Sequence, residues 1–148
     1  MEIRFVSAES EDFSSLTKLL DEYYFSIVGD VHLRYAKFNL PHLFYSRVVV
    51  YENEKAVACG CWKDLGDGKA EIKRIYVLPE YRRKGAASLI IRTLEEDIKK
   101  AGKEKIILET ARTPPESEAL YLHLGYREID YYGSPAGAEN CLCFEKDI

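Results

Sequence analysis

The segment Val77-Leu-Pro-Glu-Tyr-Arg-Arg-Lys-Gly-Ala-Ala87 joins a predicted strand to a predicted helix, and it decides the fold. Residues 70–77 indicate a strand, which Pro79 ends. Residues 83–101 carry apolar side chains at three- and four-residue spacing, which predicts an amphipathic helix stopped by Gly102. The turn between them therefore lies at a helix N-terminus, where backbone N–H groups have no partner within the helix.

Three consecutive cations, Arg82, Arg83 and Lys84, stand in this turn. Cations at a helix N-terminus oppose the helix dipole, at a cost of about 0.3–1 kcal/mol each at exposed sites. The arrangement is favourable if an anion such as a phosphate binds the free N–H groups there, and Gly85 leaves room for its approach. The alternative is a solvated basic turn. Neither Gly-x-Gly-x-x-Gly nor the Walker sequence Gly-x4-Gly-Lys-[Ser/Thr] occurs, so the dinucleotide and P-loop classes lose support.

The rest of the chain predicts an α+β domain with a mixed, mostly antiparallel sheet. Further strands are expected at residues 2–6, 47–51, 56–62, 105–108, 126–129 and 141–144, and further helices at 11–28 and, for about ten residues, from Pro114 to Gly125. Residues 31–45 indicate one or two short helices or a loop. The expected architecture is about seven strands and about four helices in a single domain spanning residues 1–148.

Composition limits the functional classes. The chain has 148 residues, of which 47% are hydrophobic and 31% charged, and this excludes a disordered protein. A formal net charge of -4 argues against a nucleic-acid partner. No apolar run reaches the roughly 20 residues of a membrane span, and no signal-peptide pattern opens the sequence. We therefore expect a cytoplasmic protein with no membrane partner.

Three motifs, in order, resemble the GCN5-related N-acetyltransferases (the GNAT superfamily). Arg82-x-x-Gly85-x-Ala87 matches the family signature [Gln/Arg]-x-x-Gly-x-[Gly/Ala]. Val77-x-Pro79 lies upstream, and Ala119-Leu-Tyr-Leu-His-Leu-Gly-Tyr126 is similar to the family's helix end Ala-x-x-x-Tyr-x-x-x-Gly-[Phe/Tyr] from Tyr121 onward, with the Ala two positions nearer to the Tyr. The resemblance covers essentially the whole chain and implies acetyl-CoA as co-substrate, no metal, and a small-molecule primary amine as acceptor. It also allows a homodimer, which is frequent in the family.

The resemblance implies which residues bind the cofactor. The strand ending at Val77 would splay from residues 105–110, and the pantetheine arm would lie between them. Glu116 stands where the family commonly has Asn, so we do not carry over a pantetheine hydrogen bond from that position. The implied pyrophosphate contacts are Arg82, Arg83, Lys84, Gly85, Ala86, Ala87 and Ser88, and the implied pantetheine contacts are the backbone of Ile75, Tyr76 and Val77.

Two catalytic residues are implied. Tyr121 matches the family's general acid, and a tyrosine hydroxyl can donate a proton to the departing thiolate. Glu71 matches the glutamate that acts as base in the histone-acetylating branch. Glu71 can instead be a strand-edge charge paired with Lys or Arg, and Glu109 or a water chain can take its place as base.

Weaker acceptor-side candidates are His32, His42, Asp21, Glu22, Tyr24, Tyr35, Tyr131 and Tyr132, and His123 lies near Tyr121. The two Cys-x-Cys pairs, at 59 and 61 and at 141 and 143, are interpreted as small apolar residues on two strands, with zinc or disulfide as the alternative. Two other functions stay open: a non-catalytic acyl-CoA sensor, and an acetyltransferase for protein N-termini or lysines.

Overall fold

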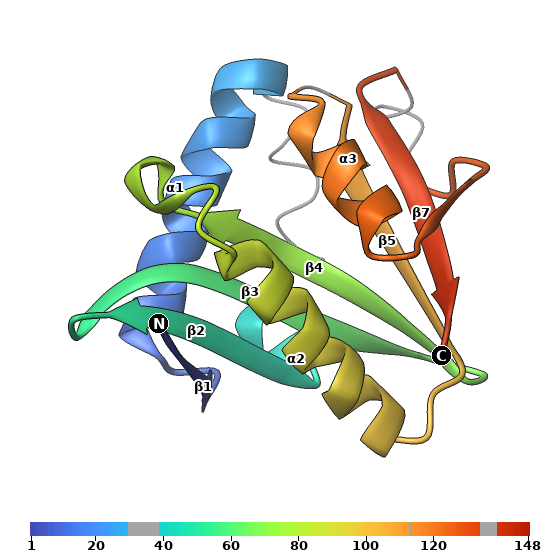
Figure 1. Cartoon of the computed structure of the whole chain (residues 1–148), viewed down its shortest axis with the longest axis horizontal. Coiled ribbons are helices and arrows are strands. Elements are labelled where there is room, and N and C mark those ends of the chain that lie inside the picture. The colour runs from blue at the N-terminus through green and yellow to red at the C-terminus, as the bar shows by residue number, and fades with distance from the viewer. Residues whose placement is uncertain (30–38, 113, 134–138) are drawn as a thin grey trace.

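One seven-stranded sheet organises the computed structural model, which describes residues 1–29, 39–112, 114–133 and 139–148 (Figure 1). The strand order is β1-β2-β3-β4-β5-β7-β6. The strands are β1 (Glu2–Val6), β2 (Ser46–Glu52), β3 (Lys55–Gly66), β4 (Lys69–Val77), β5 (Lys105–Ala111), β6 (Arg127–Ile129) and β7 (Cys141–Asp147). The predicted α+β class, with a mixed and mostly antiparallel sheet, is confirmed.

Helices cover both faces of this sheet. Helix α1 (Glu11–Val28) lies behind the sheet and helix α2 (Ala86–Lys100) lies in front, with α3 (Glu116–His123) beside β5 (Figure 1). Helix α1 begins where predicted because the Ser10 hydroxyl accepts a hydrogen bond from the Phe13 amide at 3.1 Å. Short 3-10 helices span Pro41–Leu43 and Pro79–Tyr81. None of the helices in the described ranges is long and apolar enough to cross a lipid bilayer.

The pairing between β4 and β5 positions the site. This pair is parallel, whereas the neighbouring pairs β3/β4 and β5/β7 are antiparallel, and its register runs only from Lys69↔Lys105 to Ile72↔Leu108. Beyond these positions β4 continues to Val77 and β5 to Ala111 without pairing, and the two strands diverge (Figure 1). We call this divergence the fork, and its apex lies just after Ile72 and Leu108. The predicted splay is confirmed.

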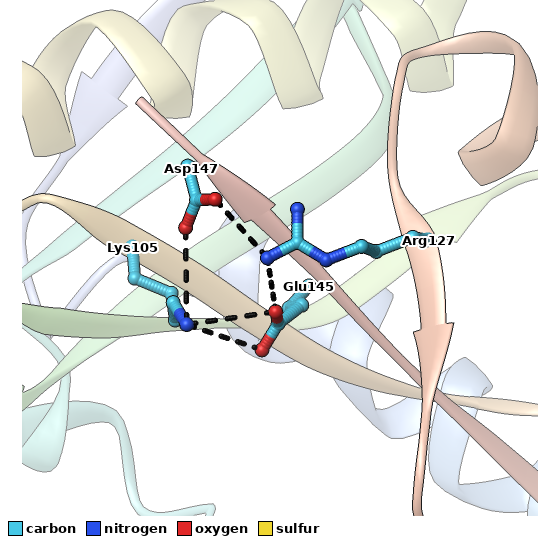
Figure 2. A network of polar contacts seen from close by, with 4 residues as sticks. All are labelled: Lys105, Arg127, Glu145 and Asp147. Atoms are coloured by element: carbon cyan, nitrogen blue, oxygen red, sulfur yellow. Dashed lines mark hydrogen bonds and ion pairs between the residues drawn. The ribbon is translucent and has the colours of Figure 1, made fainter.

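Charged side chains tie the strands together at the closed end, opposite the opening of the fork. Lys105 of β5 lies 3.4 Å from Glu145 and 3.8 Å from Asp147 of β7, and Arg127 of β6 pairs with the same two carboxylates (Figure 2). Two cations thus share two anions across three strands, although each exposed pair contributes little stability by itself.

Several predicted boundaries shift. The helix expected from residue 83 begins at Ala86, because Arg83 and Gly85 adopt positive φ angles of 63° and 87° that no helix accommodates. The strand expected at 56–62 extends to Gly66, and the one expected at 105–108 extends to Ala111. Among the described residues there are three α-helices rather than four, and most of segment 31–45 lies outside the described ranges.

The cysteines lie on two strands, as predicted: Cys59 and Cys61 on β3, and Cys141 and Cys143 on β7. All four are free, and all but Cys141 are buried. Burial raises the pKa of Cys59 to about 12, as expected for a thiol packed as a small apolar group.

Candidate active site

The turn between β4 and α2 presents backbone N–H groups. Gly85 is the N-cap of α2 and provides no side-chain hydrogen bond to the first turn, which also contains no acidic residue. The N–H groups in the first turn of α2 therefore have no partner within the helix or from its cap residue. At Gly85, an added Cβ would meet no atom within 4 Å, so the surface beside this glycine is open. The structure thus brings the predicted residues Ala86, Ala87 and Ser88 to an uncapped helix N-terminus.

The three cations of this turn have different environments. The Arg82 Nε donates to the Val77 carbonyl at 3.0 Å, which ties the turn back to the end of β4. Arg83 is exposed and lies 3.6 Å from Glu116 at the start of α3. Lys84 lies over the Tyr81 ring, 5.4 Å from its centroid. Glu116, which stands where the family commonly has Asn, therefore pairs with Arg83 of this turn.

One edge of β4 is open along the fork. Its last residues pair with β3, through Cys59↔Tyr76 and Ala58↔Val77, but not with β5. A bulge interrupts this pairing between Cys59 and Cys61, and Arg74 there has a φ of 61°. The sequence-predicted residues Ile75, Tyr76 and Val77 thus lie where an extended ligand can pair with the free edge of the strand.

Tyr121 lies on one face of the sheet at the fork. Its ring contacts Phe144 at a centroid separation of 6.0 Å, and Phe144 is paired in register with Leu108 beside the apex. Burial raises the pKa of the Tyr121 hydroxyl, and proximity to Tyr24 raises it further. The hydroxyl therefore keeps its proton near neutral pH and can donate a hydrogen bond.

Glu71 lies on the face of the sheet opposite Tyr121. The buried Ile72 shares a face with its register partner Leu108 and with Phe144, which contacts Tyr121, and side chains alternate along β4, so Glu71 points to the other face. Its Oε2 accepts a hydrogen bond from the Tyr132 hydroxyl at 2.7 Å, and its Oε1 lies 3.7 Å from the Lys73 ammonium. Its register partner is Ile107, within the paired part of the strands. The Lys73 contact agrees with the charge-pairing interpretation of Glu71, and its position near the apex of the fork leaves the catalytic interpretation open.

Glu109 occupies the same face but lies at the apex, one position past Leu108. Its carboxylate accepts hydrogen bonds from the Cys141 thiol and the Tyr131 hydroxyl. Burial raises the pKa of Glu109, and the Glu71 carboxylate raises it further. The two glutamates are therefore electrostatically coupled, and Glu109 is the one nearer the opening.

The remaining candidates are mostly not brought to this place. Asp21 forms an ion pair with Arg74 at 2.8 Å, so its charge serves to join α1 to β4. His42 lies in a 3-10 helix, and His123 is exposed at the end of α3. Tyr24 is coupled to both Glu109 and Tyr121. His32 and Tyr35 lie outside the described residues, and Glu22 is exposed.

Sequence reasoning missed Cys141, Arg74 and Gly133. Cys141 reaches Glu109 only because β7 lies beside β5, an order that skips β6 and leaves no trace in local patterns. Position 133 requires a glycine, because an added Cβ there would clash with Glu109 Oε2. A glycine after two tyrosines was the only available signal.

The fold and the fork define the class. The sequence profile of the acetyltransferase (GNAT) family matches residues 13–126, and the chain belongs to this family. It is 33% identical to the uncharacterised N-acetyltransferase YjgM of Escherichia coli over 96 residues, which are 64% of this chain and 58% of YjgM. The chain thus spans less than two thirds of the length of this curated relative.

Solved structures share the whole architecture. A protein from Klebsiella pneumoniae, described as an acyl-CoA N-acyltransferase, superimposes with a TM-score of 0.81 at 21% identity, covering 99% of this chain and 96% of that one. The PaiA N-acetyltransferase of Thermoplasma acidophilum, solved with coenzyme A, has a TM-score of 0.74 at 18% identity, with both chains fully covered. At these identities the similarity establishes the fold.

Proposed function

We propose that this protein is an acetyl-CoA-dependent N-acetyltransferase that acts on a primary amine of a small molecule. The observation that supports it most is the fork, because it opens between the strand edge at residues 75–77, which β5 does not pair with, and an uncapped helix N-terminus at Ala86. An extended pantetheine arm fits the strand edge, and a pyrophosphate fits the helix N-terminus. The family membership and the coenzyme A complex of the PaiA structure support the same ligand.

In this proposal the proton-accepting and proton-donating groups act from opposite faces of the sheet. The acceptor amine approaches from the carboxylate face, where Glu71 and Glu109 lie, and Tyr121 acts from the other. A carboxylate removes one proton from the ammonium, and the nitrogen lone pair attacks the thioester carbonyl carbon in a ternary complex. The C–N bond forms and the C–S bond breaks. The Tyr121 hydroxyl donates its proton to the departing thiolate and takes up the second nitrogen proton in its place. The products are the acetamide and the free thiol, with one proton released.

A covalent acetyl-enzyme is disfavoured by the thiols at the site. Burial and the Glu109 carboxylate raise the pKa of Cys141 to about 12, so this thiol is protonated near neutral pH and a poor nucleophile. Direct attack by the amine needs no such intermediate. This supports the ternary-complex order over a ping-pong order.

The experiment is a thermal-shift titration with acetyl-CoA, followed by a thiol-release assay with L-lysine, spermidine and kanamycin as acceptors. Acetyl-CoA at about 100 times its dissociation constant should stabilise the fold by about 2.7 kcal/mol. A shift with thiol release for one of these amines supports the proposal. A shift with no release for any amine favours a binding module, and the absence of a shift refutes the cofactor assignment.

A further inference from the structure

The two carboxylates beside the fork differ in position and in partners. Glu71 is opposite Ile107, inside the paired part of β4 and β5, whereas Glu109 is the first residue of β5 beyond the pairing. The acetyl group must lie in the opening, because the paired strands leave no gap between their backbones. Of the two, Glu109 is therefore closer to a nitrogen that attacks the thioester.

Their hydrogen-bond partners also differ in charge. The two oxygens of Glu71 are engaged by the Tyr132 hydroxyl and by the Lys73 ammonium. The partners of Glu109 are neutral: the Cys141 thiol, a weak donor, and the Tyr131 hydroxyl. Burial and the Glu71 carboxylate favour the protonated form of Glu109, and these two effects outweigh the opposing charge of Lys73.

The loop after β6 holds both side chains in place. Consecutive residues Tyr131 and Tyr132 each reach one carboxylate, Glu109 and Glu71 respectively. Gly133 closes the loop against Glu109, since a Cβ there would lie 2.0 Å from Glu109 Oε2 and 2.5 Å from the Tyr131 hydroxyl. The position of Glu109 is thus fixed from β7 and from this loop together.

We propose that Glu109 is the catalytic residue that removes the proton from the acceptor ammonium, and that Glu71 orients the ammonium beside it. This rests on the proposed function. The proton moves from the ammonium nitrogen to a Glu109 oxygen and then to solvent, and the neutral amine attacks the thioester. Glu71 and Tyr131 are positioning residues in this scheme, because they act through the charge and orientation of Glu109 and of the amine.

The environment of Glu109 sets the expected pH dependence. Its raised pKa brings it closer to neutral pH, where a general base is most effective. Because the base must be unprotonated, kcat/KM falls as the pH drops below this pKa. Among the residues that the structure describes, the titratable groups facing Glu109 are Glu71 and Lys73 on β4, Cys141 and Cys143 on β7, Tyr24 on α1, and Tyr131 and Tyr132 after β6.

The experiment compares Glu109→Gln with the matched variant Glu71→Gln. The readout is the pH profile of kcat/KM for whichever of L-lysine, spermidine and kanamycin is acetylated fastest. We expect Glu109→Gln to lower kcat at least about 100-fold and to abolish the acid limb. Glu71→Gln should raise KM for the amine and keep the limb, moved to lower pH because a neighbouring negative charge is gone. Tyr131→Phe should move the limb to higher pH, since the lost hydrogen bond favoured the carboxylate.

Two further readouts separate the possible failures. If Glu109→Gln keeps the acetyl-CoA thermal shift, its folding and cofactor binding are intact. If the wild-type protein itself shows no shift, this result refutes the proposed function and not the assignment of Glu109. Carbon-13 NMR titration of the Glu109 carboxyl in the coenzyme A complex needs no acceptor, and should show a pKa above the ordinary value of about 4.3 that falls in Glu71→Gln. An ordinary pKa, or an acid limb lost in Glu71→Gln and kept in Glu109→Gln, would overturn the proposal.

Discussion

Gly85 offers the sharpest test of the turn at residues 82–88 where we place the cofactor, here called the cofactor turn, because Gly102 is a matched control. Both have left-handed backbones, with φ of 87° and 85°, and at both an added Cβ meets no atom within 4 Å. Replacement by Ala should therefore cost the same strain at each position, about 1–2 kcal/mol. Only Gly85 lies at the N-terminus of the helix at which we place the pyrophosphate. The two variants differ in one respect alone, the approach of a ligand.

The size of the effect follows from the contacts at stake. A methyl group at Gly85 that displaces the pyrophosphate from one backbone N–H removes a charge-assisted hydrogen bond worth about 1.5–3 kcal/mol. This weakens acetyl-CoA binding by about 10- to 150-fold. At a concentration of about 100 times the wild-type dissociation constant, the stabilisation should fall from about 2.7 kcal/mol to between about 1.4 and 0.3 kcal/mol.

Differential scanning fluorimetry can resolve this difference. At about 3 °C for each kcal/mol in a domain of this size, the wild-type and Gly102→Ala proteins should shift by about 8 °C. Gly85→Ala should shift by about 1–4 °C, from a starting Tm lowered equally in both variants. A full shift in Gly85→Ala, or an equal loss in the two variants, would refute the placement of the pyrophosphate at this turn.

Two further substitutions test the site and the core. Tyr121→Phe should lower kcat by about 100-fold while the acetyl-CoA thermal shift is kept, because the lost hydroxyl acts on the departing thiolate; kcat within twofold of wild type in steady-state assays would remove this role. Asp97→Ala should lower the free energy of unfolding by about 3 kcal/mol in urea titrations, since it leaves the buried Trp62 indole N–H, now 2.8 Å from Asp97 Oδ2, without an acceptor and also removes the 2.6 Å bond from Ser46. Asp97→Asn keeps an acceptor oxygen and should lose less than half as much; equal losses would show that packing and not the hydrogen bonds matters there.

The sequence predicted most of the fold because its strongest signals are local. Helix α1 has the predicted bounds, since Ser10 caps one end and Gly29 stops the other. The start of α2 was wrong by three residues because side-chain spacing says nothing of φ at Arg83. The error lies at the candidate site itself, and functional sites are where local sequence rules are expected to fail.

The candidate site was predictable only where it is carried by a contiguous motif. The cofactor turn and Tyr121 follow from short motifs, whereas the partners of Glu109 come from three separate segments. The approach of Cys141 depends on β7 lying between β5 and β6. Long-range order of this kind depends on tertiary packing, so the choice between Glu71 and Glu109 required the structure.

The four register pairs between β4 and β5 have a consequence for how such a protein changes. Everything up to α2, including the helix N-terminus at Ala86, precedes this seam in the chain, and β5, α3, β6 and β7 follow it. The turn where we place the nucleotide end of the cofactor thus lies on the earlier stretch of the polypeptide, and Glu109 lies on the later stretch with its hydrogen-bond partners Tyr131 and Cys141. On the proposed function, we expect substitutions after Lys105 to change which amine is accepted without changing coenzyme A binding at the turn before α2, and this separation along the chain favours divergence toward new acceptors.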